Sequence, residues 1–272
     1  MALSLSSLAL EILPLRTPTL PPATHTNCYL LGRRELLVVD PGPSSSDDLA
    51  PVVERIRELV EEGASVVGVL LTHHHGDHLG GAVELAERFD APLFAHPETA
   101  RLAGFDDYRP VSEGDLFNLD GEEWRALHTP GHAPGHVVLF NEAGGELIAG
   151  DMVAGEGTIL LDPDDGDLAL YLASLERLQG LAARAIHPAH GGVLGPEILG
   201  EYISHRHMRT GQIESSLGAL GEATPEALVA HVYPELHPMA HGLAARQILC
   251  HLLWLEGRGR ARAVAGEWAP AG

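Results

Sequence analysis

A dense group of metal-ligand side chains lies in the first third of the chain. His73, His75, Asp77 and His78 fall within six positions, directly after the apolar run at 66–71. That run predicts a buried strand, because it is too short and too rich in β-branched residues for a helix. Imidazole and carboxylate groups are ligands for zinc, manganese or iron. The sequence therefore predicts a metal site at a strand-to-helix corner, and the carboxylate suggests a second ion beside the first.

Three further segments each end a strand-like run with one ligand-type residue in a Gly- or Pro-rich turn. The three are His132 after the run at 124–127, Asp151 after 146–149 and His190 after 183–187. Because α/β folds build their sites where strands end, we expect these residues to join the first group. A surface tract that binds metal by accident would lack the buried strand in front and the Gly-Gly start of a helix behind.

The elements that must position these residues alternate over the first two thirds of the chain. Predicted strands cover residues 8–15, 27–31, 35–39, 66–71, 92–96 and 183–187, with three more inside 122–150. Predicted helices cover residues 46–62, 77–89, 98–103 and 167–178. After residue 195 the pattern changes to helices at 196–217, 224–232 and 242–255 and a hairpin at 260–268. This order predicts a layered α/β sandwich followed by a small helical domain.

Composition narrows the function classes. The chain has 272 residues, a net charge of −21, and 17 basic residues that are all arginine. Without lysine, a Schiff-base mechanism and a phosphate-loop lysine are excluded. So acidic a surface repels polyanions, which disfavours a broad nucleic-acid footprint. The segment from 201 on is near charge balance, with six Arg against seven Asp or Glu, so it is not basic either.

Cysteine use and the N-terminus bear on the compartment. Cys28 and Cys250 lie far apart in apolar runs, which predicts buried free thiols in a reducing cytoplasm. Residues 1–15 have no basic start and are interrupted by Glu11, so they predict a first strand rather than a signal peptide. No apolar stretch approaches the ~20 residues that a membrane span needs, so we expect no membrane association.

In combination, these segments resemble the metallo-β-lactamase superfamily over residues 8–195. The resemblance rests on the stretches at 72–78, 129–132, 150–151 and 188–191, with 27–30 and 38–42 in support. It implies a four-layer αββα sandwich over residues 1–195, with the site at the sheet edges. It makes His73, His75 and His132 the ligands of a first metal and Asp77, His78 and His190 those of a second. Asp151 would bridge the two ions.

Two positions bear on the branch of the superfamily. Most true β-lactamases lack Asp at the bridging position, so Asp151 points to hydrolases of the glyoxalase II, lactonase and nuclease kinds. Gly191-Gly192 departs from the acidic residue usual there in glyoxalase II-like, lactonase-like and persulfide dioxygenase-like enzymes. The chain is most similar to the lactamase-like protein 2 group, which implies a winged-helix domain at 196–272. One animal branch of that group is a single-strand endoribonuclease.

The expected chemistry is hydrolysis by a metal-bound hydroxide. Two divalent ions, with zinc favoured over manganese or iron, can share a water and lower its pKa towards neutrality. Asp77 would orient the hydroxide as well as bind metal, and Asp40 is our candidate to brace the metal loop. His136 is equally compatible with a supporting contact and with a buried structural histidine.

Other polar residues carry weaker predictions. His96 ends a strand and could line the pocket. Arg206 could hold an anionic group, although for a helix arginine a solvated position is commoner. We expect structural roles for His74, His187, His231, His237, His241 and His251.

Three function classes follow. The first is a two-metal hydrolase of an ester, thioester, lactone or phosphodiester bond, either on a small ester-like substrate, which we favour, or on single-stranded RNA. The second is a mononuclear iron oxygenase of the persulfide type, and the third a DNA-binding regulator. The full set of seven ligands favours the first. For residues 196–272 a lid or a homodimer surface is favoured over nucleic-acid binding, because the segment is not basic.

Overall fold

The structure is a computed structural model that describes residues 9–271. Leu8 and the residues before it, where the predicted first strand began, lie outside the described residues. The chain forms two compact units. The first comprises the chain up to Thr129 with Pro134–Ile159 and Leu181–Pro196, and the second comprises Pro130–Ala133, Leu160–Gly180 and the chain from Glu197 on.

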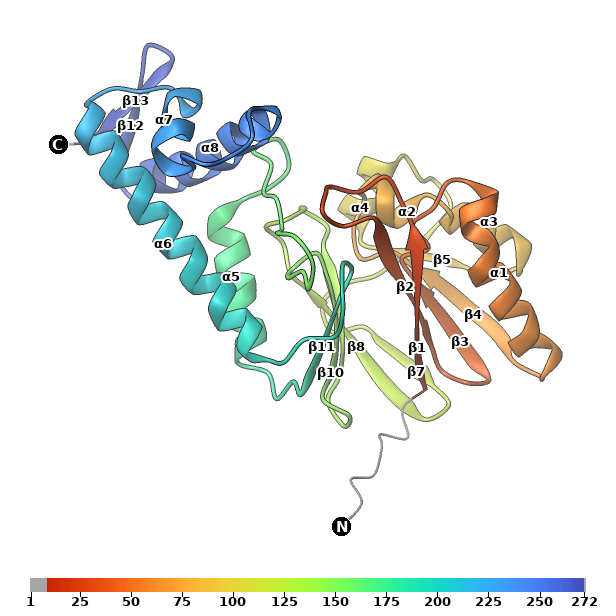
Figure 1. Cartoon of the computed structure of the whole chain (residues 1–272). Coiled ribbons are helices and arrows are strands. Elements are labelled where there is room, and N and C mark those ends of the chain that lie inside the picture. The colour runs from red at the N-terminus through yellow and green to blue at the C-terminus, as the bar shows by residue number, and fades with distance from the viewer. Residues whose placement is uncertain (1–8, 272) are drawn as a thin grey trace. The chain divides into compact units, whose positions relative to one another are not determined.

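The first unit contains two sheets, which its helices flank (Figure 1). The first sheet has the order β1-β2-β3-β4-β5-β6, with strands Leu10–Arg16, His25–Leu31, Glu35–Val39, Ser65–Leu70, Leu93–Ala95 and Arg109–Pro110. The second has the order β11-β10-β9-β8-β7, with strands Ala185–Pro188, Glu146–Gly150, Val137–Asn141, Glu122–His128 and Leu116–Leu119. The two short strands β6 and β7 were not predicted, because runs this short carry little periodicity.

Alternate residues of the strands face two different cores. Tyr29 and Leu31 of β2 pack between the sheets against Trp124 and Leu139 of the second sheet. Leu30, between them in sequence, packs on the opposite face with the helices. This period-two alternation is what a central strand buried on both faces requires. The predicted αββα sandwich is confirmed.

Helices α1 (Ser46–Glu61), α3 (Ala82–Arg88) and α4 (Pro97–Ala103) belong to the first unit with the one-turn helix α2 (Gly76–Leu79). The single helix predicted over 77–89 is wrong, since it is divided into α2 and α3 at Gly80 and Gly81. The reason is the close approach of the loop after β3. Gly80 N–H donates to the Gly42 carbonyl at 3.1 Å, and a Cβ on Gly80 would lie 2.4 Å from the same oxygen.

The second unit is helical and carries a short hairpin (Figure 1). Its elements are α5 (Leu168–Gln179), α6 (Glu197–Leu220), α7 (Pro225–Val232), the 3₁₀ turn Pro238–Ala240, α8 (His241–Gly257), β12 (Ala261–Val264) and β13 (Glu267–Pro270). Thr224 caps α7 by accepting from Ala227 N–H at 3.2 Å. Leu228, Ile248 and Trp268 share one apolar core. Three helices and a hairpin around one core make a winged helix. A boundary between residues 195 and 196 stays a prediction.

Within residues 9–271, no helix combines the length and the apolar character needed to cross a bilayer.

Candidate metal centre

Asp40 fixes the start of the metal loop where β4 ends. Its carboxylate accepts from Thr72 N–H at 2.7 Å and from the Thr72 hydroxyl at 2.6 Å. The same carboxylate lies 2.9 Å from His78 Nδ1. Asp40 is buried and has a left-handed backbone with φ of 51°, a conformation that Asp tolerates better than most residues. The predicted brace is thus present in the structure.

These contacts also fix ring orientations. The Thr72 hydroxyl gives its hydrogen to Asp40, so at 3.0 Å from His73 Nδ1 it acts as the acceptor. His78 Nδ1 likewise donates to a carboxylate. In both rings Nδ1 is thus occupied, which leaves Nε2 for another partner, a proton or a metal ion. His73 Nε2 lies 3.0 Å from His75 Nδ1, so these two predicted ligands face one another.

Asp151 is placed by the end of β10 and by His136. The backbone N–H of Asp151 donates to His136 Nε2 at 3.1 Å, and His136 Nδ1 lies 2.9 Å from the Thr129 hydroxyl. Gly150 has φ of 50°, and a Cβ there would lie 2.6 Å from His136 Nε2. His136 is fully buried and also supports Asp151. The two alternatives that the sequence left open, a supporting contact and a buried structural histidine, therefore both hold.

His190 is held by strand β2, through residues that the sequence analysis did not assign to the site. His190 Nδ1 donates to the His25 carbonyl at 3.0 Å. Asn27 Nδ2 donates to the carbonyls of Pro188 and Gly191, each at 2.8 Å, and the Tyr29 hydroxyl donates to Pro188 at 2.6 Å. The sequence signal that could have pointed to these contacts was the polar Asn27 at the start of the predicted strand 27–31, whose other residues are mostly apolar.

Gly191 explains one departure from the family pattern. Its φ is 87°, and a Cβ there would lie 2.5 Å from Glu156 N and 2.6 Å from the Gly155 carbonyl carbon. The loop that follows Asp151 therefore packs directly on this glycine. An acidic side chain at this position has no room in this chain.

The side chains converge without closing a hydrogen-bonded network. His78 Nε2 lies 3.5 Å from Asp151 Oδ1 and 3.9 Å from Asp77 Oδ1. His190 Nε2 lies 3.4 Å from Asp151 Oδ1 and 3.7 Å from Asp77 Oδ2. His78 Nε2 is buried and makes no hydrogen bond. Within the first unit, two sets have the compactness of a metal site, namely His73, His78 and Asp151, and Asp77, His78 and His190.

A buried imidazole lone pair facing two carboxylates fits a divalent cation, because both groups are metal ligands and the cation would offset their charge. The residues present therefore fit the metal that the sequence predicts. Ligand roles for the individual residues stay predictions.

The carboxylates of this cluster favour a positive charge beside them. Burial by itself lowers the pKa of His78, but the carboxylates of Asp151, Asp40 and Asp77 outweigh burial and raise it to about 10. The pKa of His190 is also raised: burial opposes the shift, and the contact with Asp151 overcomes it. A bound cation would take the place of these protons.

His132 lies in the four-residue stretch Pro130–Ala133, which packs with the second unit. Its Nδ1 donates to the Leu160 carbonyl at 2.9 Å, so its Nε2 also keeps a lone pair. Thr129 and Pro134, on either side of the stretch, belong to the first unit. His132 remains a predicted ligand of the first metal.

Several other predictions are settled by local contacts. His96 caps α4, accepting from Glu98 N–H at 3.2 Å, and stacks on His128 with centroids 4.3 Å apart, so it supports local structure. His187 pairs with Glu146 at 2.6 Å and is structural, as predicted. Cys28 and Cys250 are buried free thiols, which is also confirmed.

Arg206 is not on a solvated face. It is only 3% exposed and lies inside the second unit, with its guanidinium carbon 5.1 Å from the centre of the Tyr171 ring. The expectation that this arginine lies on a solvated helix face is therefore wrong, because the side chain points from α6 towards α5.

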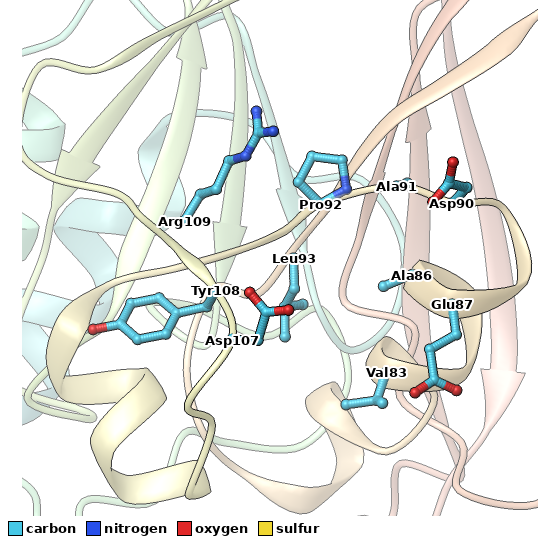
Figure 2. Close-up of a pocket in the computed structure, with 10 residues that line it drawn as sticks. All are labelled: Val83, Ala86, Glu87, Asp90, Ala91, Pro92, Leu93, Asp107, Tyr108 and Arg109. Carbon is cyan, nitrogen blue, oxygen red and sulfur yellow. The ribbon is translucent and has the colours of Figure 1, made fainter.

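A separate pocket of about 470 Å³ opens in the first unit beside α3 and β5. Figure 2 shows Tyr108, Asp107 and Arg109 on one side and Glu87 and Asp90 on the other. It shares no residue with the two metal-site sets and is distinct from them.

Comparison with known proteins agrees with the fold. The family model described as Metallo-beta-lactamase superfamily matches residues 21–190, and the Beta-lactamase associated winged helix domain matches 224–268. A crystal structure of a beta-lactamase domain protein from Burkholderia ambifaria is similar, with a TM-score of 0.85 and 25% identity. That similarity covers 96% of this chain and 91% of the other.

Curated relatives include the Beta-lactamase-like protein 2 homolog of Drosophila melanogaster, 32% identical over 255 residues, which are 87% of this chain and 84% of the relative. Lactamase-like protein aptB of Emericella nidulans is 35% identical over 198 residues, and an atrochrysone carboxyl ACP thioesterase of Aspergillus chevalieri is 34% identical over the same length. Each of these two alignments spans 71% of this chain and 60% of the relative's length. With its αββα sandwich and its His/Asp cluster at the strand ends, the chain belongs to the metallo-β-lactamase superfamily.

Proposed function

We propose that the chain is a metal-dependent hydrolase that uses two divalent ions, most favourably zinc. The observation that carries the proposal is that Asp151 forms one compact set with His73, a predicted ligand of the first ion, and His78, a predicted ligand of the second. A carboxylate beside ligands of both ions is the arrangement expected of a ligand shared by the two. His78 and His190 Nε2, at 3.5 and 3.4 Å from Asp151 Oδ1, would bind the second ion. His73, His75 and His132 would complete the first ion's ligands, and Asp77 those of the second.

When bound, two such ions acidify water and polarise the oxygen of a scissile carbonyl or phosphoryl group. The protein's residues have to orient this chemistry. We assign the acceptance of a proton to Asp77; in support, 17% of its side chain is exposed and its carboxylate faces His78 and His190. The buried contacts of Asp40 and His136 keep the ligands in place.

For the substrate we propose a small ester or thioester. The similarity to a protein named a thioesterase supports the acyl class. The net charge of −21 disfavours long polyanions. A small thioester needs few contacts outside the metal centre, so an acidic surface does not oppose its binding.

The winged-helix segment offers little to a nucleic acid. Helix α8 would be the candidate for insertion into a groove, yet Gln247, Ile248 and His251 on it are buried. Arg246, a basic residue of this helix, is engaged by Asp162 and Asp164. A phosphate backbone is bound through free Arg and Lys side chains, which this helix does not present.

The test is a substrate panel with matched variants. Wild type and Asp77→Ala are assayed with thioesters, lactones and aryl esters and with a labelled single-stranded RNA oligomer. We expect metal-dependent hydrolysis of a small ester or thioester that Asp77→Ala reduces strongly. If wild type cleaves the RNA, the variant does not, and neither hydrolyses the small esters, our proposal is wrong and the chain is a single-strand endoribonuclease.

A further inference from the structure

A continuous chain of contacts inside the second unit leads from helix α8 to the ring of His132. The His132 Nδ1–H donates to the Leu160 carbonyl at 2.9 Å. The next residue, Leu161, donates its backbone N–H to Gln247 Oε1 on α8 at 2.9 Å. Its carbonyl accepts from the Cys250 thiol, also on α8, at 3.2 Å. Both backbone polar groups of Leu161 are thus held by one helix.

The neighbouring residues tie the same loop down a second time. Arg246 of α8 makes a two-pronged contact with the Asp162 carboxylate, its Nε donating at 2.6 Å. Further along the loop, Asp167 N–H donates to the carbonyl of Gly131 at 2.8 Å. The loop of residues 160–167 therefore grips the His132 turn at the imidazole and at the preceding carbonyl.

Gly131 explains why this turn depends on outside support. Its φ is 131°, and a Cβ there would lie 2.1 Å from Tyr171 N at the start of α5. The turn is thus shaped by close packing on α5 and by the loop. The left-handed glycine has more backbone freedom than any other residue type and cannot hold the turn alone.

We propose that helix α8 of the winged helix is a positioning element for the metal ligand His132, and that Gln247 is its central positioning residue. The inference rests on the proposed function in one respect, the assignment of His132 as a ligand. Gln247 is 7% exposed and Leu161 is fully buried, so water does not substitute for their contact. Loss of the acceptor would free the Leu161 N–H and let the Leu160 carbonyl shift away from the imidazole.

This gives the winged helix a purpose that needs no nucleic acid. Three residues of its helix α8 hold the loop that orients the predicted ligand, namely Arg246, Gln247 and Cys250. Contacts that orient metal-binding histidines typically change metal affinity by about 10–100-fold when removed.

The test uses three variants of the full chain. Gln247→Leu removes the acceptor at similar volume, and Gln247→Glu keeps an oxygen that can accept from Leu161. Ile248→Val is the matched control, since it trims the adjacent buried residue of α8 without touching the loop. Zinc affinity is measured by competition with a chromophoric chelator. Amide hydrogen exchange is measured on the metal-free proteins over residues 128–135 and 159–164.

We expect Gln247→Leu to weaken zinc binding at the first site, that of His132, by about 10–100-fold and to speed exchange in both segments. Gln247→Glu should fall closer to wild type, and Ile248→Val should match wild type in both readouts. Unchanged zinc affinity and unchanged exchange in Gln247→Leu would overturn the proposal. If wild type binds no zinc, the proposed function fails, and the exchange data still decide whether α8 braces the His132 turn.

Discussion

Replacement of Asp40 by Asn separates the bracing of the metal loop from its backbone conformation. Asn tolerates the left-handed φ of 51° almost as well as Asp, so the backbone is kept. The carboxylate accepts three hydrogen bonds, two from Thr72 and one from His78. The carboxylate uses both oxygens, Oδ1 for Thr72 N–H and Oδ2 for the Thr72 hydroxyl and His78, whereas a neutral amide offers only one acceptor atom. Whichever position the amide nitrogen takes, at least one of these donors loses its acceptor, so the loop that carries His73 and His78 is held less firmly.

The expected size of the effect follows from the kind of contacts that are lost. Loss of a contact that orients a metal-binding histidine costs about 10–100-fold in affinity, or about 1.4–2.7 kcal/mol. Hydrogen bonds to a charged group contribute about 1.5–3 kcal/mol each, so stability falls as well. We therefore expect Asp40→Asn to lower both the zinc affinity and the melting temperature.

Asp120→Asn is the matched control. Asp120 also has a left-handed φ, 54°, and accepts from the backbone N–H groups of Arg33 and Arg34. Its hydrogen bonds and ion pair are with Arg33, Arg34 and Glu35, none of which is a predicted ligand. We expect it to lower the melting temperature and leave zinc affinity unchanged. Equal affinity losses in the two variants, or none in Asp40→Asn, would refute the bracing argument.

Three further predictions concern single residues. Asp151→Ala should impair both metal sites, whereas His190→Ala should mainly weaken the second, as titration with zinc against a chelator would show. Gly191→Ala should lower the melting temperature, because a left-handed φ of 87° and a Cβ 2.5 Å from a backbone nitrogen leave no unstrained conformation. Burial, with Arg206 and Arg209, lowers the pKa of His251 to about 3, against about 6.5 when unfolded. Between these two pH values the unfolded state binds more protons than the folded state. Through His251, the free energy of unfolding is therefore highest above pH ~6.5 and falls by up to about 1.4 kcal/mol per pH unit below it. His251→Asn should flatten this dependence in thermal unfolding measured from pH 7 to 4.

The spacing of ligand-type residues predicted much of the cluster because strand ends converge at one edge of a sheet. His73, His78, Asp77, Asp151 and His190 all follow predicted strands, and the structure brings them together. The residues that hold them were harder to find. Asn27 and Tyr29 act on the His190 loop from more than 150 residues away, and no local pattern encodes a partner at that distance.

Local patterns also failed where packing overrides them. The helix predicted over 77–89 is divided because the loop after β3 approaches Gly80 and Gly81. Arg206 is buried because of its neighbours on other helices, which a single amphipathic helix pattern does not reveal. Asp40 was predicted as a brace, and its contacts with Thr72 and His78 agree with that role.

The most direct test of the two-metal account is elemental analysis of the full chain purified without added metal. The account predicts close to two divalent ions per chain, with zinc the most abundant. The prediction rests on the seven predicted ligands, which are more than one ion needs. A folded protein that carries one iron per chain, or no metal at all, would contradict it.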